Sequence, residues 1–104
     1  MSEVNLTVHA FRIDDNKEAA LKPLEEAAEV FGAWQVLEPF TSAPALNPNY
    51  DPEQLWPREV KIKKKKLVNK IADCIQACVN LANSYNLDLT DAMERCEEQN
   101  RGRR

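Results

Sequence analysis

Glycine is scarce in this sequence. Only Gly32 and Gly102 occur among 104 residues, and seventy positions separate them. Rossmann and P-loop nucleotide sites need several glycines in one loop, where the backbone approaches a phosphate. The sequence therefore excludes both kinds of glycine-rich nucleotide site. Cysteine is limited to three residues without a Cys-x-x-Cys pair, which indicates neither a disulfide framework nor a four-cysteine zinc site.

Net positive charge and long apolar runs are absent as well. The net charge of −3 and the pI of about 5.2 argue against general nucleic-acid binding, which needs a broad basic face. No apolar run approaches the roughly 18 residues of a membrane-spanning helix, and residues 1–16 lack the apolar core of a secretory signal. We therefore expect a cytoplasmic protein that does not enter a membrane. The length and the 43% hydrophobic content are typical of one globular domain over residues 1–104.

Hydrophobic periodicity predicts a first helix. It is expected to begin at Asp15 or Asn16, or nearer Lys22 because Pro23 suits a first turn, and to reach about Val36. Its apolar stripe recurs at steps of three and four and consists of Leu21, Leu24, Ala28 and Phe31.

The segments on either side of this helix are expected to lack helical structure. Apolar and polar residues alternate briefly within residues 1–15, which predicts either a short strand or an extended arm over a helix pair. Residues 37–57 hold five of the six prolines and predict an irregular connection, with Tyr50 and Trp56 as candidate anchors. Such a long loop is either a solvated spacer or a cover for a ligand or partner surface.

A second helix is expected from Arg58 or Val60 to Tyr85, with Asn86 ending it. It has an apolar stripe made of Leu67, Ile71, Cys74, Ile75, Cys78, Ala82 and Tyr85. Another side carries amide and acid groups, namely Asn69, Asp73, Gln76 and Asn80. This polar side either lines a hydrated cavity between helices or is the solvated face of an ordinary amphipathic helix.

A third helix is expected to open at Asp88 or Thr90. Its apolar residues are Leu89, Ala92, Met93 and Cys96. Three helices of this composition form a thin core. We therefore expect an all-α antiparallel helix bundle whose core is completed by self-association, as a homodimer or homotetramer.

Three acidic side chains are crowded on the first predicted helix, at Glu25, Glu26 and Glu29. Like charges one turn apart repel, so the arrangement is favoured when a divalent cation lies between them. The alternative is a solvated acidic face, because glutamate is a strong helix former. If Asp73 of the second helix faced Glu26 and Glu29, their oxygens would form a site for Mg²⁺.

Several segments around these acids match a known pattern. They are Glu25–Glu29, Ile71-Ala72-Asp73, Val79-Asn80-Leu81-Ala82 and Gln99-Asn100-Arg101. Over roughly residues 21–103 the sequence resembles the MazG-like all-α nucleoside triphosphate pyrophosphohydrolases, and this resemblance implies their helix-bundle fold. That family has two Glu spaced by three on one helix and then a Glu and an Asp spaced by three on the next. Glu26 and Glu29 match the first pair, and Asp73 matches the final Asp.

The resemblance implies cleavage of a nucleoside triphosphate, with or without the deoxy sugar, to the monophosphate and pyrophosphate. Mg²⁺, or Mn²⁺ in its place, would be held by Glu26, Glu29 and Asp73. Glu25 or Glu26 would act as the catalytic base.

The resemblance also suggests residues that contact the nucleotide. Asn100, Arg101 and Arg103 match the family's terminal segment of Asn and basic residues, and a frayed, solvated end of the chain is the alternative. Asn80 is a further candidate contact, with helix packing as its alternative.

Lys70 is the main departure from the family pattern, which has Glu three residues before Asp73. An ammonium in place of a carboxylate weakens metal binding. Either the Lys70 side chain turns away, or its ammonium occupies part of the metal's place and contacts a phosphate itself. Two functions follow: an active pyrophosphohydrolase, or a catalytically impaired MazG-like module that binds nucleotide or a protein partner. A third alternative is an unrelated helical interaction protein whose acids lie on its surface.

Overall fold

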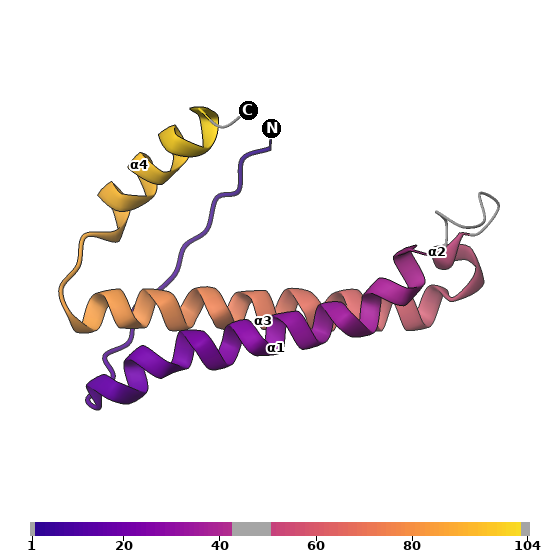
Figure 1. The fold of residues 1–104 in the computed structure, drawn as a ribbon, viewed down its shortest axis with the longest axis horizontal. Helices are drawn as coiled ribbons and strands as arrows, with labels where there is room; N and C mark the ends of the chain where they lie inside the picture. Colours follow the sequence, from indigo (N-terminus) through magenta and orange to yellow (C-terminus); the bar gives the residue numbers. More distant parts are fainter. Residues whose placement is uncertain (1, 43–50, 103–104) are drawn as a thin grey trace.

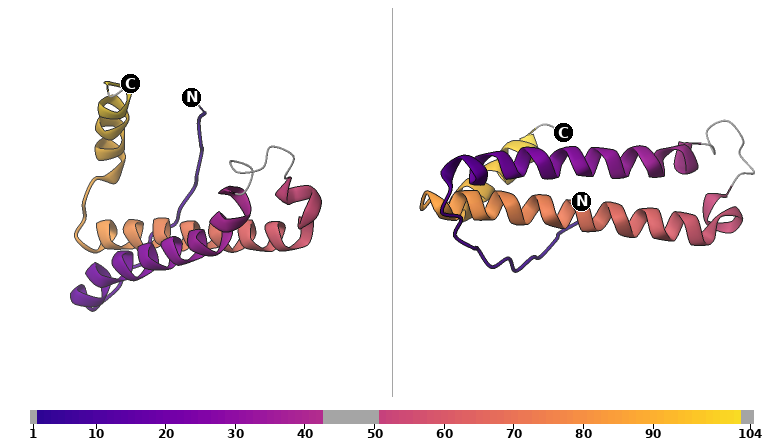
Figure 2. Two further views of the ribbon diagram at one scale, coloured as in Figure 1. Left: turned by 45° about the vertical axis from the view of Figure 1, so that its right-hand side comes forward. Right: turned by 90° about the horizontal axis from the view of Figure 1, so that it is seen from below.

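The structure, a computed structural model, describes residues 2–42 and 51–102. Helix α1 (Asn16–Ser42) and helix α3 (Pro57–Ser84) are long, helix α2 (Pro52–Leu55) is a single turn, and helix α4 is Leu89–Gly102. These two ranges contain no strand, so the predicted all-α class is confirmed for them. Helices α1 and α3 run antiparallel and side by side, whereas α4 and the N-terminal segment project from this hairpin (Figures 1 and 2).

Asp15 caps the start of α1. Its Oδ1 accepts a hydrogen bond from the Glu18 backbone N–H at 3.0 Å, and its carbonyl accepts one from the Ala19 N–H at 2.9 Å. A side-chain acceptor at this position satisfies one of the free N–H groups of a first turn. The helix therefore begins before Pro23, and the alternative start near Lys22 is wrong.

The other end of α1 lies further along the chain than expected. The helix passes Val36 and Pro39 and ends at Ser42. Each internal proline removes one backbone hydrogen bond. The long packing surface against α3 outweighs this cost, because tertiary contacts override local propensity.

The irregular connection expected over residues 37–57 is shorter in the structure. Residues 37–42 belong to α1, and α2 and α3 begin at Pro52 and Pro57. Trp56 does act as an anchor, because its ring meets Phe40 edge-on with centroids 6.3 Å apart. Tyr50 lies outside the described residues.

The end of α3 and the start of α4 lie where the sequence predicts them. Asn86 follows α3 with a φ of 54°, a left-handed conformation that asparagine adopts more readily than most residues. Asp88 then caps α4, since its Oδ1 accepts a hydrogen bond from the Asp91 N–H at 3.1 Å. Both predicted helix boundaries are confirmed.

The face of α1 that packs on α3 is not the predicted one. The buried residues of α1 are Ala19, Glu26, Ala33 and Leu37. The predicted stripe of Leu21, Leu24, Ala28 and Phe31 is exposed throughout. Small alanine side chains let two helices approach closely, so the alanine face packs inward. The larger apolar residues lie on another side of the helix.

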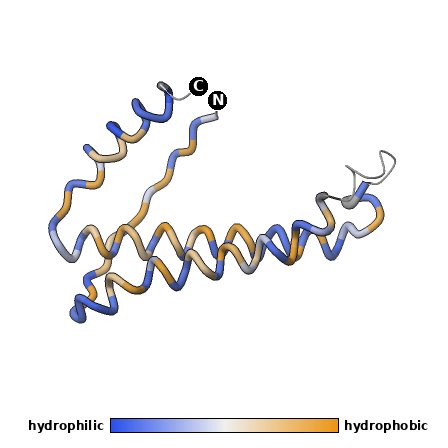
Figure 3. Tube along the Cα trace, viewed as in Figure 1, coloured by the Kyte–Doolittle hydropathy of each residue, from blue (hydrophilic) through white to orange (hydrophobic). Residues whose placement is uncertain are grey.

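The apolar stripe predicted on α3 is likewise wrong in part. The buried residues of α3 are Val60 and Ala77, whereas Ile71, Cys78 and Tyr85 are exposed. Leu67, Cys74 and Ala82 of the predicted stripe are half-buried, and so is Lys70, which the stripe did not include. Figure 3 shows that hydrophobic and hydrophilic segments alternate along both helices of the hairpin.

The N-terminal segment is an extended arm, and the predicted alternative of a strand is wrong for residues 2–15. Two hydrogen bonds tie the arm to α3. The Phe11 N–H donates to Asn80 Oδ1 at 2.9 Å, and Gln76 Nε2 donates to the His9 carbonyl at 2.8 Å. Gln76 also donates to Asn80 Oδ1 at 2.8 Å, so the two amides hold the arm as a unit.

None of the helices within residues 2–42 and 51–102 has the length and apolarity needed to cross a membrane.

Candidate functional site

Glu26 is the one acidic residue that is buried in the described part of the chain. It lies on the face of α1 that packs on α3, and only 8% of the residue is exposed. When Glu26 is ionised, no N–H or O–H group among the described residues donates a hydrogen bond to its Oε2. A buried carboxylate oxygen without a partner is costly, and native proteins keep such groups where a function needs them.

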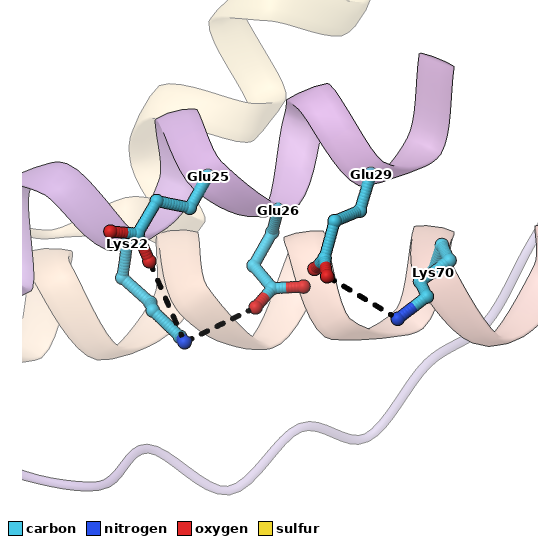
Figure 4. Close-up of polar contacts among 5 residues, drawn as sticks. All are labelled: Lys22, Glu25, Glu26, Glu29 and Lys70. Atoms are coloured by element: carbon cyan, nitrogen blue, oxygen red, sulfur yellow. Dashed lines mark ion pairs between the residues drawn. The ribbon is translucent and has the colours of Figure 1, made fainter. Parts of the chain in front are cut away.

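Two lysines from different helices flank this acid. Lys22 Nζ lies 3.4 Å from Glu26 Oε1 and 3.7 Å from Glu25 Oε2, all three residues being on α1. Lys70 of α3 reaches across the hairpin, and its Nζ lies 3.6 Å from Glu29 Oε1. Figure 4 shows these side chains as a row along the hairpin, with Glu26 and Glu29 lying between Lys22 and Lys70. We call Lys22, Glu26, Glu29 and Lys70 the charge row.

The two central carboxyls of the charge row differ in acidity. The pKa of Glu26 is raised for two reasons. Protonated Glu26 donates a hydrogen bond to Glu29, and the burial of Glu26 disfavours its charged form. The pKa of Glu29 is lowered, because Glu29 accepts that hydrogen bond and lies beside the Lys70 ammonium. The two carboxyls are thus shifted in opposite directions, as is typical of carboxyls with separate acid and base roles.

Lys22 was not among the residues predicted from the sequence, although its spacing to Glu26 gave a signal. Residues four apart on a helix are neighbours. A hydrogen bond to Glu26 and the Glu26 charge raise the pKa of Lys22, so Lys22 is fixed as a cation.

Cys74 of α3 lies on the Glu26 side of the hairpin. Burial raises the pKa of the Cys74 thiol, and the neighbouring Cys78 and Glu26 raise it further. A thiol in this environment stays protonated and unreactive. The α3 positions that meet the acid pair are therefore Lys70 and Cys74.

Asp73 lies between these two positions in sequence but is exposed. No ion pair joins it to another residue of the described ranges, and residues 2–42 and 51–102 hold no group of three or more acidic, His or Cys side chains suited to a metal. Glu25 is also exposed, on the solvent side of Lys22. Of the predicted site residues, the structure brings together Glu26, Glu29 and Lys70.

These side chains do not fit a divalent cation as they lie. Glu26 and Glu29 offer the hard oxygen ligands that Mg²⁺ prefers. Lys22 and Lys70, however, place one ammonium within 3.4 Å of Glu26 and another within 3.6 Å of Glu29. These two ammonium groups repel a divalent cation and occupy the carboxylate oxygens that it would need as ligands.

The other predicted contact residues lie elsewhere or are engaged. Asn80 holds the N-terminal arm through its Oδ1. Arg101 pairs with Glu97 at 2.8 Å, and Asn100 Nδ2 donates to Cys96 Sγ at 3.4 Å, both within α4. Arg103 lies outside the described residues.

Comparison of the chain with family models, with curated proteins and with solved structures finds no match in any of the three.

Proposed function

We propose that this chain is a MazG-like nucleotide-binding domain arranged for the hydrolysis of a nucleoside triphosphate to the monophosphate and pyrophosphate. The observation that supports the proposal is the burial of Glu26 beside Glu29 at the α1–α3 interface. The same spacing of two acids on one helix, facing the next helix, is the pattern on which the resemblance to that family rests. A merely solvated acidic face would not bury Glu26 at a helix interface, and Glu29 lies beside it with its side chain 48% exposed.

The charge row offers two of the functions that phosphate hydrolysis requires. Lys22 and Lys70 are cations that can hold phosphate oxygens by charge-assisted hydrogen bonds. Glu26, whose pKa is raised by Glu29 and by burial, can exchange a proton with an attacking water. Because the row does not fit Mg²⁺, the proposal assigns the positive charge near the phosphates to the two lysines.

A second candidate function is a catalytically impaired module that binds a nucleotide without turnover. The ion pair between Lys70 and Glu29 favours it. This pair occupies the position where the resembled family has a metal-binding carboxylate. Lys70 separates the two candidates, since an active site must work with this ammonium and an impaired site is disabled by it.

Pyrophosphate release from a panel of nucleoside triphosphates, with Mg²⁺ or Mn²⁺, tests both candidates. The unmodified chain is compared with Lys70→Glu and Glu26→Gln, and Glu94→Gln on α4 is the matched control because Glu94 is exposed and outside the charge row. Turnover that is lost in Glu26→Gln and kept in Glu94→Gln supports the hydrolase. Turnover in Lys70→Glu alone supports the impaired module.

Calorimetric titration with the same nucleotides completes the test. Nucleotide binding that weakens in Glu26→Gln or Lys70→Glu, without turnover, also supports the impaired module. Neither turnover nor nucleotide binding in any variant contradicts both candidates.

A further inference from the structure

The side of α1 that faces away from α3 is apolar and uncovered. Its large residues are exposed by 69% at Leu24, 57% at Phe31 and 42% at Trp34, and the last two rings stack with centroids 5.5 Å apart. At about 100° per residue, Leu24 lies about 160° around the helix from Glu26 of the packed face. We call Leu21, Leu24, Phe31 and Trp34 the outward face of α1. A helix that is apolar on two nearly opposite sides is typical of one that is covered on both.

A groove of about 960 Å³ lies between the N-terminal arm and α4. Its apolar lining consists of Val4 and Leu6 from the arm and Met93 and Cys96 from α4, and charged side chains, Glu3, Glu94, Glu97 and Arg101, line it as well. Figures 1 and 2 show α4 and the beginning of the arm extending away from the hairpin on the same side, whereas the arm meets α3 at His9 and Phe11. We call this space the arm–α4 groove. Its apolar lining residues are exposed by 75% at Val4 and 58% at Met93, so they too lack a cover.

The single chain exposes more surface than a compact monomer of its mass. Its accessible surface is 8475 Å², whereas a compact chain of this mass exposes about 5,900 Å². The surplus is thus about 2,500 Å², and a standard protein interface takes about 800 Å² from each partner. The radius of gyration of 17.4 Å likewise exceeds the roughly 13 Å of a compact domain of this length. One chain therefore leaves enough surface for a stable dimer.

We propose that two copies of this chain associate reciprocally, with the outward face of α1 of each copy seated in the arm–α4 groove of the other. The chain carries both halves of the contact, and two identical contacts related by a twofold axis close without leaving a free half. The lengths agree as well. Leu21 to Trp34 spans about 20 Å of helix, and the 14 residues of α4 span about 21 Å. This inference does not rest on the proposed function.

The oligomeric state tests the proposal. Light scattering after size exclusion is expected to give a dimer for the unmodified chain and a monomer for Leu24→Glu, which puts a charge in the outward face. Met93→Glu, which puts a charge in the groove, is expected to give a monomer as well. Ile62→Glu is the control, because Ile62 is 56% exposed on α3 and belongs to neither surface, and it is expected to stay dimeric. Far-UV circular dichroism checks that each variant keeps its helices.

Mixing the two monomeric variants tests the pairing itself. The Leu24→Glu copy keeps its groove, and the Met93→Glu copy keeps its outward face, so the mixture is expected to form a heterodimer through one intact contact. A monomeric unmodified chain overturns the proposal. A dimer that survives either charged variant, or a mixture that stays monomeric, also overturns it.

Discussion

Replacing Leu37 by alanine is expected to unfold the chain more easily than the same change at Leu24. Both residues lie on α1, but Leu37 is 8% exposed on the packed face and Leu24 is 69% exposed on the outward face. Leucine to alanine removes three carbon atoms, worth about 2.4 kcal/mol at about 0.8 kcal/mol for each buried carbon, and the remaining cavity adds to this. The free energy of unfolding should therefore fall by about 2–4 kcal/mol in Leu37→Ala. In a single chain it should fall by about 0.7 kcal/mol in Leu24→Ala, because most of the Leu24 side chain is already exposed.

Urea denaturation followed by circular dichroism, at several protein concentrations, measures both losses. The Leu37→Ala loss should appear at every concentration, because it acts within one chain. The Leu24→Ala loss should grow as the concentration rises, because the outward face is covered only when two copies associate. Equal losses at the lowest concentration would refute the reasoning, since they would mean that Leu24 is packed inside the single chain.

Three further predictions concern the charge row, the arm and the core. Above pH 4.5, the ordinary pKa of a glutamate, the unfolding free energy should fall as pH rises through the raised pKa of Glu26, and it should fall less in Glu26→Gln. Below pH 4.5 it should fall as pH drops through the lowered pKa of Glu29, which thermal unfolding across pH measures. Asn80→Ala should speed hydrogen exchange at the Phe11 amide about fivefold, by the loss of a hydrogen bond worth about 1 kcal/mol, whereas Asn80→Asp keeps the acceptor and should leave the rate nearly unchanged. Val60→Ala should cost about 1–2 kcal/mol in urea, because Val60 is only 2% exposed and two methyl groups are lost. Unchanged stability would contradict the placement of Val60 in the core.

The sequence predicted the helices well where capping residues mark their ends. Asp15, Asn86 and Asp88 act through their own side chains or local backbone, so their effects are readable without the fold. The prolines misled the prediction. Proline usually ends or kinks a helix, but α1 continues through both Pro23 and Pro39. Packing against α3 keeps it helical, and no local sequence pattern reveals that packing.

The packing faces were harder to predict than the helices. Periodicity identifies apolar positions on α1 but does not say which of two apolar sides meets α3. Leu24 and Phe31 form the more obvious stripe, yet the smaller Ala19 and Ala33 are the buried ones. Close helix approach favours small residues, which hydrophobic patterns weigh lightly.

The candidate site was predicted in part. Glu26, Glu29 and Lys70 were identified from their spacing and from the family resemblance, and the structure brings these three together. Asp73 was expected beside them but is exposed, because the packing face of α3 runs through Lys70 and Cys74. That register depends on how two helices meet, which one sequence alone does not determine.

Lys70 is proposed to control whether the Glu26–Glu29 pair can bind a divalent cation. The most direct test is the shift of the thermal unfolding midpoint with Mg²⁺, measured for the unmodified chain, for Lys70→Glu and for Lys70→Glu combined with Glu26→Gln. A ligand at a hundred times its dissociation constant stabilises a fold by about 2.7 kcal/mol. We expect no shift in the unmodified chain, an upward shift in Lys70→Glu, and loss of that shift in the double variant. Equal stabilisation of the unmodified chain and Lys70→Glu by Mg²⁺ would contradict the account.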